Sequence, residues 1–117
     1  MHETDKPVVG VKFDGAKPDY SLVPFGALDE VVKVLTYGAK KYDRHNWRHV
    51  EDIRYQAALM RHFSAYMQGE RNDPESGINH LAHLACSVMF LLQKDLDAQK
   101  QITKEPTNHL HLAKSVV

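Results

Sequence analysis

The chain has 117 residues, enough for one domain with a modest core but too few for two. Its 15 basic and 15 acidic side chains cancel, and a pI near 7.1 gives no overall attraction to nucleic acid or to an acidic membrane. The single cysteine, Cys86, permits neither an intramolecular disulfide nor a thiolate zinc cluster. The sequence shows neither a signal-peptide pattern nor the ~20 apolar residues of a membrane span, so we expect a cytoplasmic protein.

Residues 1–23 have no helical periodicity and contain two prolines and two glycines. We therefore predict an extended N-terminal segment whose apolar residues pack on the rest of the domain. A glycine loop in this segment carries Lys12, Asp14 and Lys17. Because glycine lets the backbone approach closely and lysines supply positive charge, such a loop can bind phosphates, and a plain solvated turn is the alternative.

Helical periodicity then predicts three helices and no sheet. The first begins near Pro24 with Ser21 as a possible cap, and the second covers about 52–68. The third runs from Asp73, as its N-cap, to about residue 99. The predicted buried face of the second helix consists of Ile53, Ala57, Met60, Phe63 and Met67.

The predicted fold class is therefore all-α, a compact bundle of three main helices in a single domain over 1–117. Its helical core covers 24–99 and is followed by a tail, 100–117, to which we assign no structure. The third helix is apolar on most sides, so we expect a second subunit to complete the bundle in a dimer or tetramer.

The loop after the first helix is rich in basic and aromatic residues. Trp47, beside Tyr42 and Asn46, is either a stacking platform for a base or a cover for the edge of the core. Lys40 and Lys41 at the end of the first helix add positive charge next to it.

Acids and imidazoles gather at the junction of the second and third helices. His80 and His83 are neighbours one turn apart, so both can face one ion or one anionic ligand. The other members of this group are Arg61, His62, Glu70, Asp73 and Glu75. Carboxylates favour Mg²⁺ or Mn²⁺, imidazoles favour softer ions such as Zn²⁺, and a mixed set fits any of these. The alternative is that the acids only cap a helix and the histidines are structural.

Three segments in chain order resemble the phage and bacterial dATP/dGTP diphosphohydrolase domain family, which includes the MazZ-type enzymes: KFDGAKPDYSLVP, LTYGAKKYDRHNWR and RHFSAYMQGERNDPESGINHLAHLACSVMFLL. The resemblance implies an all-α fold related to the MazG/HisE nucleotide pyrophosphohydrolases. Those enzymes cleave nucleoside triphosphates between the α- and β-phosphates with Mg²⁺ held by carboxylates on two helices. This chain departs from their ExxE and ExxD pattern, since His80-x-x-His83 stands where ExxD is expected and Arg61-His62 lies in the ExxE region.

The residues and the resemblance together predict a metal-dependent purine (deoxy)nucleoside triphosphate pyrophosphohydrolase. It would convert dATP or dGTP to the monophosphate and pyrophosphate with Mg²⁺ or Mn²⁺, and control the nucleotide pool in the cytoplasm (that of the host if the gene is carried by a phage). The expected metal ligands are Glu70, Asp73, Glu75, His80 and His83, all of them except Glu75 also catalytic. The expected substrate contacts are Lys12, Asp14, Lys17, Lys40, Lys41, Tyr42, Asn46, Trp47, Arg61 and His62.

The alternative function is a non-catalytic helical module that binds nucleotide or metal as a regulator or interaction protein. It would bind the same ligands without turnover. We expect neither a membrane nor a nucleic acid as a partner, because the chain has no net charge and no basic stripe.

Overall fold

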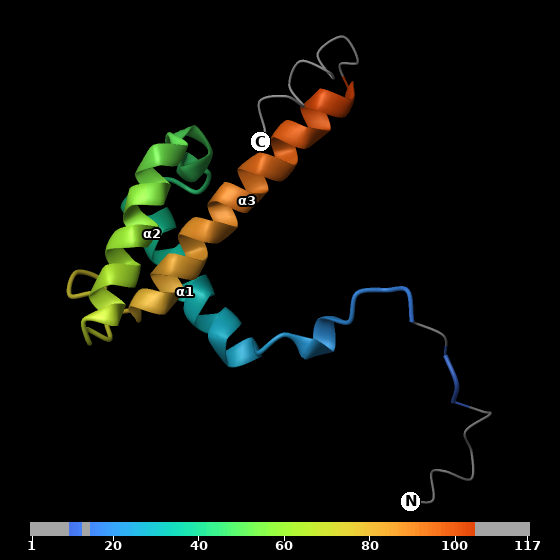
Figure 1. The fold of residues 1–117 in the computed structure, drawn as a ribbon, viewed down its shortest axis with the longest axis horizontal. Coiled ribbons are helices and arrows are strands. Elements are labelled where there is room, and N and C mark those ends of the chain that lie inside the picture. The colour runs from blue at the N-terminus through green and yellow to red at the C-terminus, as the bar shows by residue number, and fades with distance from the viewer. Residues whose placement is uncertain (1–9, 13–14, 105–117) are drawn as a thin grey trace, which may run out of the picture.

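The computed structural model describes residues 10–12 and 15–104. Its main elements are three helices, α1 (Phe25–Lys41), α2 (Asp52–Met67) and α3 (His80–Lys104), shown in Figure 1. Two short 3₁₀ turns, η2 (Tyr20–Leu22) and η3 (Asn46–His49), precede α1 and α2. The described residues contain no strand beyond an isolated bridge between Asn72 and Asn79. The prediction of an all-α fold with three main helices is confirmed.

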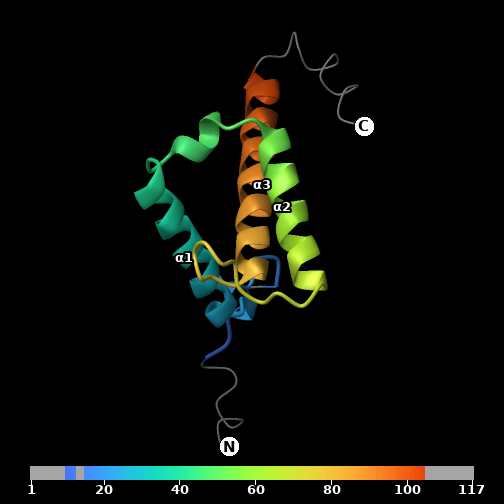
Figure 2. The same cartoon turned by 90° about the vertical axis from the view of Figure 1, so that its left-hand side faces the viewer.

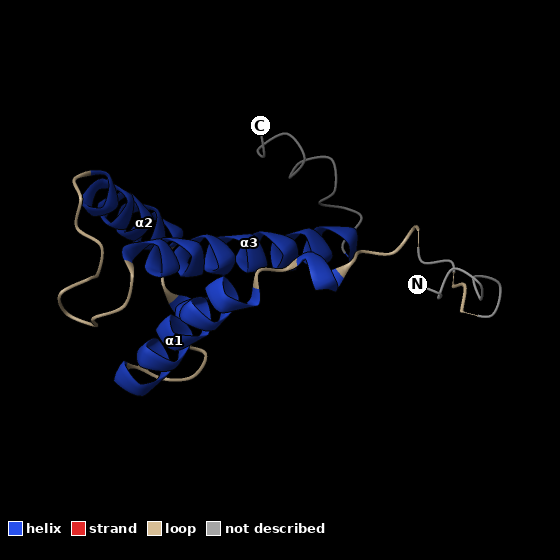
Figure 3. Cartoon of the chain, turned by 90° about the horizontal axis from the view of Figure 1, so that it is seen from below, coloured by secondary structure: helices blue, strands red, loops and turns tan. Residues whose placement is uncertain are grey.

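Helix α3 is the central element, because it packs against both α1 and α2. Figures 2 and 3 show α2 running beside α3 while α1 lies on its other side. The buried apolar residues gather where α1 crosses the first half of α3, and they are Val31, Val34, Ala82 and Cys86. Leu35, Ile78 and Phe90 pack around this core. No helix in the described part of the chain is long and apolar enough to cross a membrane.

The start of α3 differs from the prediction. Asp73 does not cap this helix, which begins at His80 and runs to Lys104, past the predicted end near residue 99. Residues 68–79 instead form a loop that turns at Gly77, whose φ of +75° is outside the helical region. The Asp73 N–H donates to the Ile78 carbonyl at 2.9 Å and closes this loop. The Asn79 side chain then caps α3 by accepting from the Leu81 N–H at 2.8 Å.

The prediction for the buried face of α2 was wrong. Ile53 and Met67 are 64% and 65% exposed, and Ala57, Met60 and Phe63 are exposed with them. The face toward the bundle is half-buried and consists of Tyr55, Ala58, Leu59 and His62. Both faces have helical spacing. The face that α2 turns toward the bundle is the one that carries His62, whose ring contacts His80 and His83 on α3.

The N-terminal segment also differs from the prediction. Its described part leads away from the helices rather than packing on them (Figures 1 and 3). Ser21 does not cap α1; its N–H donates to Asp19, at 3.0 Å, inside the turn η2. Pro24 precedes α1 without a side-chain cap. Residues 1–9 and 105–117, the second range covering most of the predicted tail, lie outside the described part.

Candidate functional site

A cleft of about 660 Å³ lies between α1 and α2, with α3 as its floor. Its volume is within the range of roughly 300–1,000 Å³ that is typical of small-molecule sites. The floor is one face of α3, on which His83, Cys86, Ser87 and Phe90 follow helical spacing. The predicted site residues that line the cleft are Lys41, Tyr42, Asn46, Trp47, Arg61, His62, Asp73, Glu75 and His83.

Several predicted site residues are not brought to the cleft. Lys12 and Lys17 are exposed on the N-terminal segment, and Lys40 is exposed on α1 outside the cleft wall. Asp14 lies outside the described residues. His80 and Glu70 also do not line the cleft, but hydrogen bonds connect them to a residue that does.

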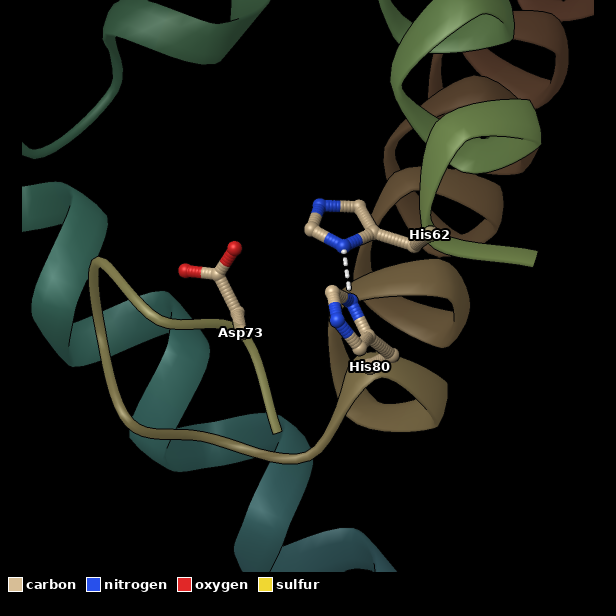
Figure 4. A group of neighbouring side chains, drawn as sticks. All are labelled: His62, Asp73 and His80. Atoms are coloured by element: carbon tan, nitrogen blue, oxygen red, sulfur yellow. Dashed lines mark hydrogen bonds between the residues drawn. The ribbon is translucent and has the colours of Figure 1, made fainter. Parts of the chain in front are cut away.

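Three histidines meet where α2 passes the start of α3. His62 Nδ1 and His80 Nδ1 are hydrogen-bonded at 2.8 Å, and Figure 4 shows the two rings facing each other with Asp73 opposite. The His62 ring also stacks on that of His83, with centroids 4.5 Å apart and planes 9° apart. His80 Nε2 is bonded to Glu70 Oε1 at 2.7 Å, and His80 is only 3% exposed. The predicted pair His80 and His83 is therefore completed by an imidazole from α2.

The loop before α3 carries an acid to the same place. Asp73 Oδ2 accepts a hydrogen bond from the Ser76 N–H at 2.9 Å and lies 3.9 Å from His83 Nε2. Ser76 Oγ is bonded to His83 Nε2 at 2.7 Å and accepts from the Ile78 N–H at 3.1 Å. The turn at Gly77 thus holds both Asp73 and Ser76 against the histidines.

The environment sets the charge of these groups. Burial lowers the pKa of His62, and the neighbouring imidazoles lower it further. Burial also lowers the pKa of His83 by more than the Asp73 carboxylate raises it. Burial raises the pKa of Asp73, but hydrogen bonds from Ser76 and the nearby imidazoles outweigh this, so that its pKa lies below the usual value. Near neutral pH His62 and His83 are therefore neutral imidazoles beside the ionised Asp73 carboxylate.

Glu75 has partners on α1 instead. It forms an ion pair with Lys41 and accepts a hydrogen bond from the Tyr37 hydroxyl at 3.0 Å. The bond from Lys41, followed by the one from Tyr37, lowers the pKa of the Glu75 carboxyl. These contacts connect the loop before α3 to α1 and hold Glu75 apart from the group formed by His62, Asp73 and His80.

The opposite end of the cleft is aromatic. Trp47 stacks on Phe90 with centroids 4.6 Å apart and planes 7° apart, and the Arg48 guanidinium lies 4.3 Å from the same indole ring. Because a flat ring has only two faces, these neighbours leave none free for a base. Trp47 therefore covers the edge of the core, as one of the two sequence interpretations has it. Tyr42 is 63% exposed and, with Asn46, lines the cleft nearby.

One set of side chains has the arrangement of a metal site. The potential ligand atoms of His62, Asp73 and His80 all lie within 4.8 Å of one another. Sequence reasoning placed His62 among the substrate contacts and did not include it in this group. Periodicity offers no signal for it, since only the pairing of α2 with α3 brings His62 to His80.

Comparisons with known proteins place the chain in a family. Residues 8–105 match the family described as dATP/dGTP diphosphohydrolase, N-terminal. A protein of Salmonella phage PMBT28 named dATP/dGTP diphosphohydrolase is 36% identical over 84 residues, which is 72% of this chain and 29% of that protein. The chain thus aligns with less than a third of this relative. No solved structure matches the chain.

Proposed function

Because the chain belongs to the dATP/dGTP diphosphohydrolase N-terminal family, we propose that it hydrolyses dATP or dGTP to the monophosphate and pyrophosphate. The name of the phage relative supports this substrate class. Such an activity would control the purine deoxynucleotide pool of the cytoplasm.

The observation that carries the proposal is the content of the single cleft between α1 and α2. Its walls bring an acid–imidazole cluster, three basic side chains (Lys41, Arg44 and Arg61) and an aromatic end into one volume of about 660 Å³. A nucleoside triphosphate needs these three environments in a row, for the reacting phosphate, the polyphosphate charge and the base.

Charged residues at the walls would bind the polyphosphate. Arg61 on α2 and Lys41 on α1 line the cleft from opposite sides, and the ion pair that Lys41 would exchange for a phosphate is exposed. Exposed ion pairs contribute little to stability, so this exchange costs little. Tyr42 and Asn46 would contact the base at the aromatic end.

The acid–imidazole cluster would serve the attacking water. His83 is neutral near pH 7 and can accept a proton, while the Asp73 carboxylate can orient the water beside it. We propose Mg²⁺ or Mn²⁺ as the metal of the reaction, since both ions accept a carboxylate donor such as Asp73, and the imidazoles beside it suit Mn²⁺. Such an ion would supply charge stabilisation for the phosphates and activation of the water.

The test is a product assay on the purified chain with each dNTP and NTP, with Mg²⁺ or Mn²⁺, resolved by ³¹P NMR. Monophosphate and pyrophosphate from purine deoxynucleotides are the expected products. Nucleoside with inorganic triphosphate would contradict the proposal and place the chemistry in another phosphohydrolase class. Absence of turnover with every substrate, together with a thermal shift by nucleotide, would favour the non-catalytic binding module instead.

We also propose that the chain forms a dimer or tetramer. The outward face of α2 exposes Ile53, Met60, Phe63 and Met67, and one face of α3 exposes Leu81, Val88, Leu92 and Leu96. Two neighbouring helices that expose apolar stripes along their length need a cover, and a second copy offers the same two stripes. Light scattering at micromolar concentration should report a dimer or larger, and Met60→Glu should shift it toward the monomer. A monomeric parent chain would contradict this.

A further inference from the structure

We infer that His62, Asp73 and His80 form a metal site that selects a first-row transition ion, such as Mn²⁺, Co²⁺ or Zn²⁺, over Mg²⁺. Glu70 is the positioning residue of this site rather than one of its ligands. The inference deepens the proposed function and takes its catalytic meaning from it, whereas binding of the metal alone can be measured independently.

The positions of the donor atoms support three ligands to one ion. The ligand atoms of His62, Asp73 and His80 come from α2, the loop before α3 and α3 itself, and all lie within 4.8 Å of one another. With metal–nitrogen bonds of about 2.0–2.1 Å, two imidazole ligands have their nitrogens about 2.8–3.0 Å apart at octahedral angles and about 3.3–3.4 Å apart at tetrahedral angles. His62 Nδ1 and His80 Nδ1 are 2.8 Å apart, so a slight opening of the two rings admits the ion.

The hydrogen bonds show which nitrogen is free to bind. His80 Nε2 lies 2.7 Å from a carboxylate oxygen of Glu70, which only accepts, so His80 carries its proton on Nε2. With a single ring proton on Nε2, the His80 Nδ1 atom presents its lone pair to His62. The 2.8 Å between the two Nδ1 atoms then fits a hydrogen bond in which the His62 Nδ1–H donates to His80 Nδ1. When that proton moves to His62 Nε2, which is a change of tautomer, the Nδ1 atoms of His62 and His80 each present a lone pair to the ion.

Glu70 fixes this arrangement from behind. The contact from its carboxylate through the His80 ring to Nδ1 is the carboxylate–histidine–metal pattern, in which the acid sets the tautomer and orientation of the ligand. The backbone holds Glu70 in place, because its N–H donates to the Ala65 carbonyl at 3.0 Å at the end of α2. The sequence-based expectation of Glu70 as a ligand is thus replaced by a positioning role.

The donor set determines the selectivity. Two imidazole nitrogens and one carboxylate oxygen suit Mn²⁺, Co²⁺ or Zn²⁺, whereas Mg²⁺ prefers oxygen ligands and keeps its water shell. The nearby acid that would make the site richer in oxygen, Glu75, is engaged by Lys41 and Tyr37. His83 stacks on His62 and is bonded to Ser76, so it fixes the ring plane of a ligand without being one.

The test measures metal binding to the purified full chain without nucleotide. Mn²⁺ binding is followed by electron paramagnetic resonance, Co²⁺ binding by its visible absorption, and Mg²⁺ and Zn²⁺ binding by competition. We expect one Mn²⁺ or Co²⁺ per chain, bound at least about tenfold more tightly than Mg²⁺. Equal affinity for Mg²⁺ and Mn²⁺ would overturn the inference.

Three variants test the assignment of roles. His62→Gln should abolish the Co²⁺ absorption, and Glu70→Gln should weaken binding by about 10–100-fold while keeping the same spectrum. His49→Gln is the matched control, since His49 is exposed on η3 and does not line the cleft. Unchanged Mn²⁺ affinity in His62→Gln, with native far-UV circular dichroism, would overturn the assignment. A Glu70→Gln spectrum that differs from the parent would make Glu70 a ligand and also overturn it.

The two proposals fail in different ways. Tight Mn²⁺ binding without turnover of any nucleotide would contradict the proposed function and leave the metal site standing. If Mg²⁺ supports turnover as well as Mn²⁺ does, and His62→Gln does not change that turnover, the proposed metal site is wrong and the proposed function stands.

Discussion

The two ends of the cleft are built in different ways. At the acid–imidazole end, side chains from α2, from the loop before α3 and from α3 form hydrogen bonds with one another. His62 is bonded to His80, His80 to Glu70, and His83 to Ser76. At the aromatic end, Phe90 and Arg48 pack against the Trp47 ring. Tyr42 and Asn46, which come after α1 in the chain, line the cleft beside it. The first end has its geometry set before a ligand arrives, whereas the second can adapt to one.

This difference suits a division of labour. Reacting groups must be held close to productive positions, because small displacements are costly in rate. In the proposed function the base would contact exposed groups such as Tyr42, which is 63% exposed. Trp47, the most conspicuous aromatic residue of the sequence, supports this end instead of binding at it: the Arg48–Asp97 ion pair at 3.1 Å and the stack on Phe90 fasten η3 to α3.

The largest expected effect is at the fixed end. Asp73→Asn should lower kcat by about 10²–10⁴-fold, because it removes the charge that orients water or metal. The amide keeps an oxygen that can accept from the Ser76 N–H, so the far-UV signal of the helices should be unchanged. Asp95→Asn, an exposed carboxylate of α3 outside the cleft, is the matched control. Full activity of Asp73→Asn would reduce Asp73 to a structural member of the loop.

A pair of substitutions tests the assignment at the aromatic end. Trp47→Ala should lower the free energy of unfolding by about 2–3 kcal/mol, since it removes the half-buried ring packed on Phe90. Tyr42→Ala should leave stability nearly unchanged but raise KM for purine nucleotides. Urea unfolding and steady-state kinetics measure the two effects. If Trp47→Ala were stable and only KM rose, Trp47 would be the base platform after all.

The floor between the two ends can be tested by pH. Burial raises the pKa of the Cys86 thiol to about 11, while in the unfolded chain it ionises near its ordinary value of about 8.5. Stability from this group is therefore fully present below about pH 8.5 and is lost as pH rises through 11, by about 3 kcal/mol in total. Urea unfolding at pH 8 and at pH 10.5 measures this loss, and the free energy of unfolding should fall less between the two pH values in Cys86→Ala than in the parent chain. The same pH dependence in both proteins would mean that water reaches the Cys86 thiol at the floor of the cleft.

The smallest expected effect distinguishes two adjacent lysines. Lys41 lines the cleft and Lys40 does not, although the sequence offers no reason to separate them. Lys41→Met should raise KM for the triphosphate by about tenfold through the loss of one charge contact. Lys40→Met should have a clearly smaller effect on KM. Equal effects would mean that the polyphosphate extends outside the cleft.

Much of this protein follows from local sequence. Helical spacing determines that α1, α2 and α3 form, and it also puts His80, His83 and Ser87 on one face of α3. Gly69 and Gly77, both with positive φ, mark the loop between α2 and α3. The family likewise is carried by segments that are continuous in sequence.

Only the tertiary structure decided which of these local features meet. Helix α2 has two faces of apolar spacing, and contact with α3 turned His62 inward and left Ile53 and Met60 exposed. Asp73, the predicted N-cap, instead belongs to a hydrogen-bonded loop. The loop turns at Gly77, and the Asp73 carboxylate accepts a hydrogen bond from the Ser76 N–H. Periodicity records the spacing of residues along one helix and carries no information on what lies opposite. The pairing of His62 with His80 therefore depends on how the consecutive helices α2 and α3 pack, which the periodicity of neither helix records.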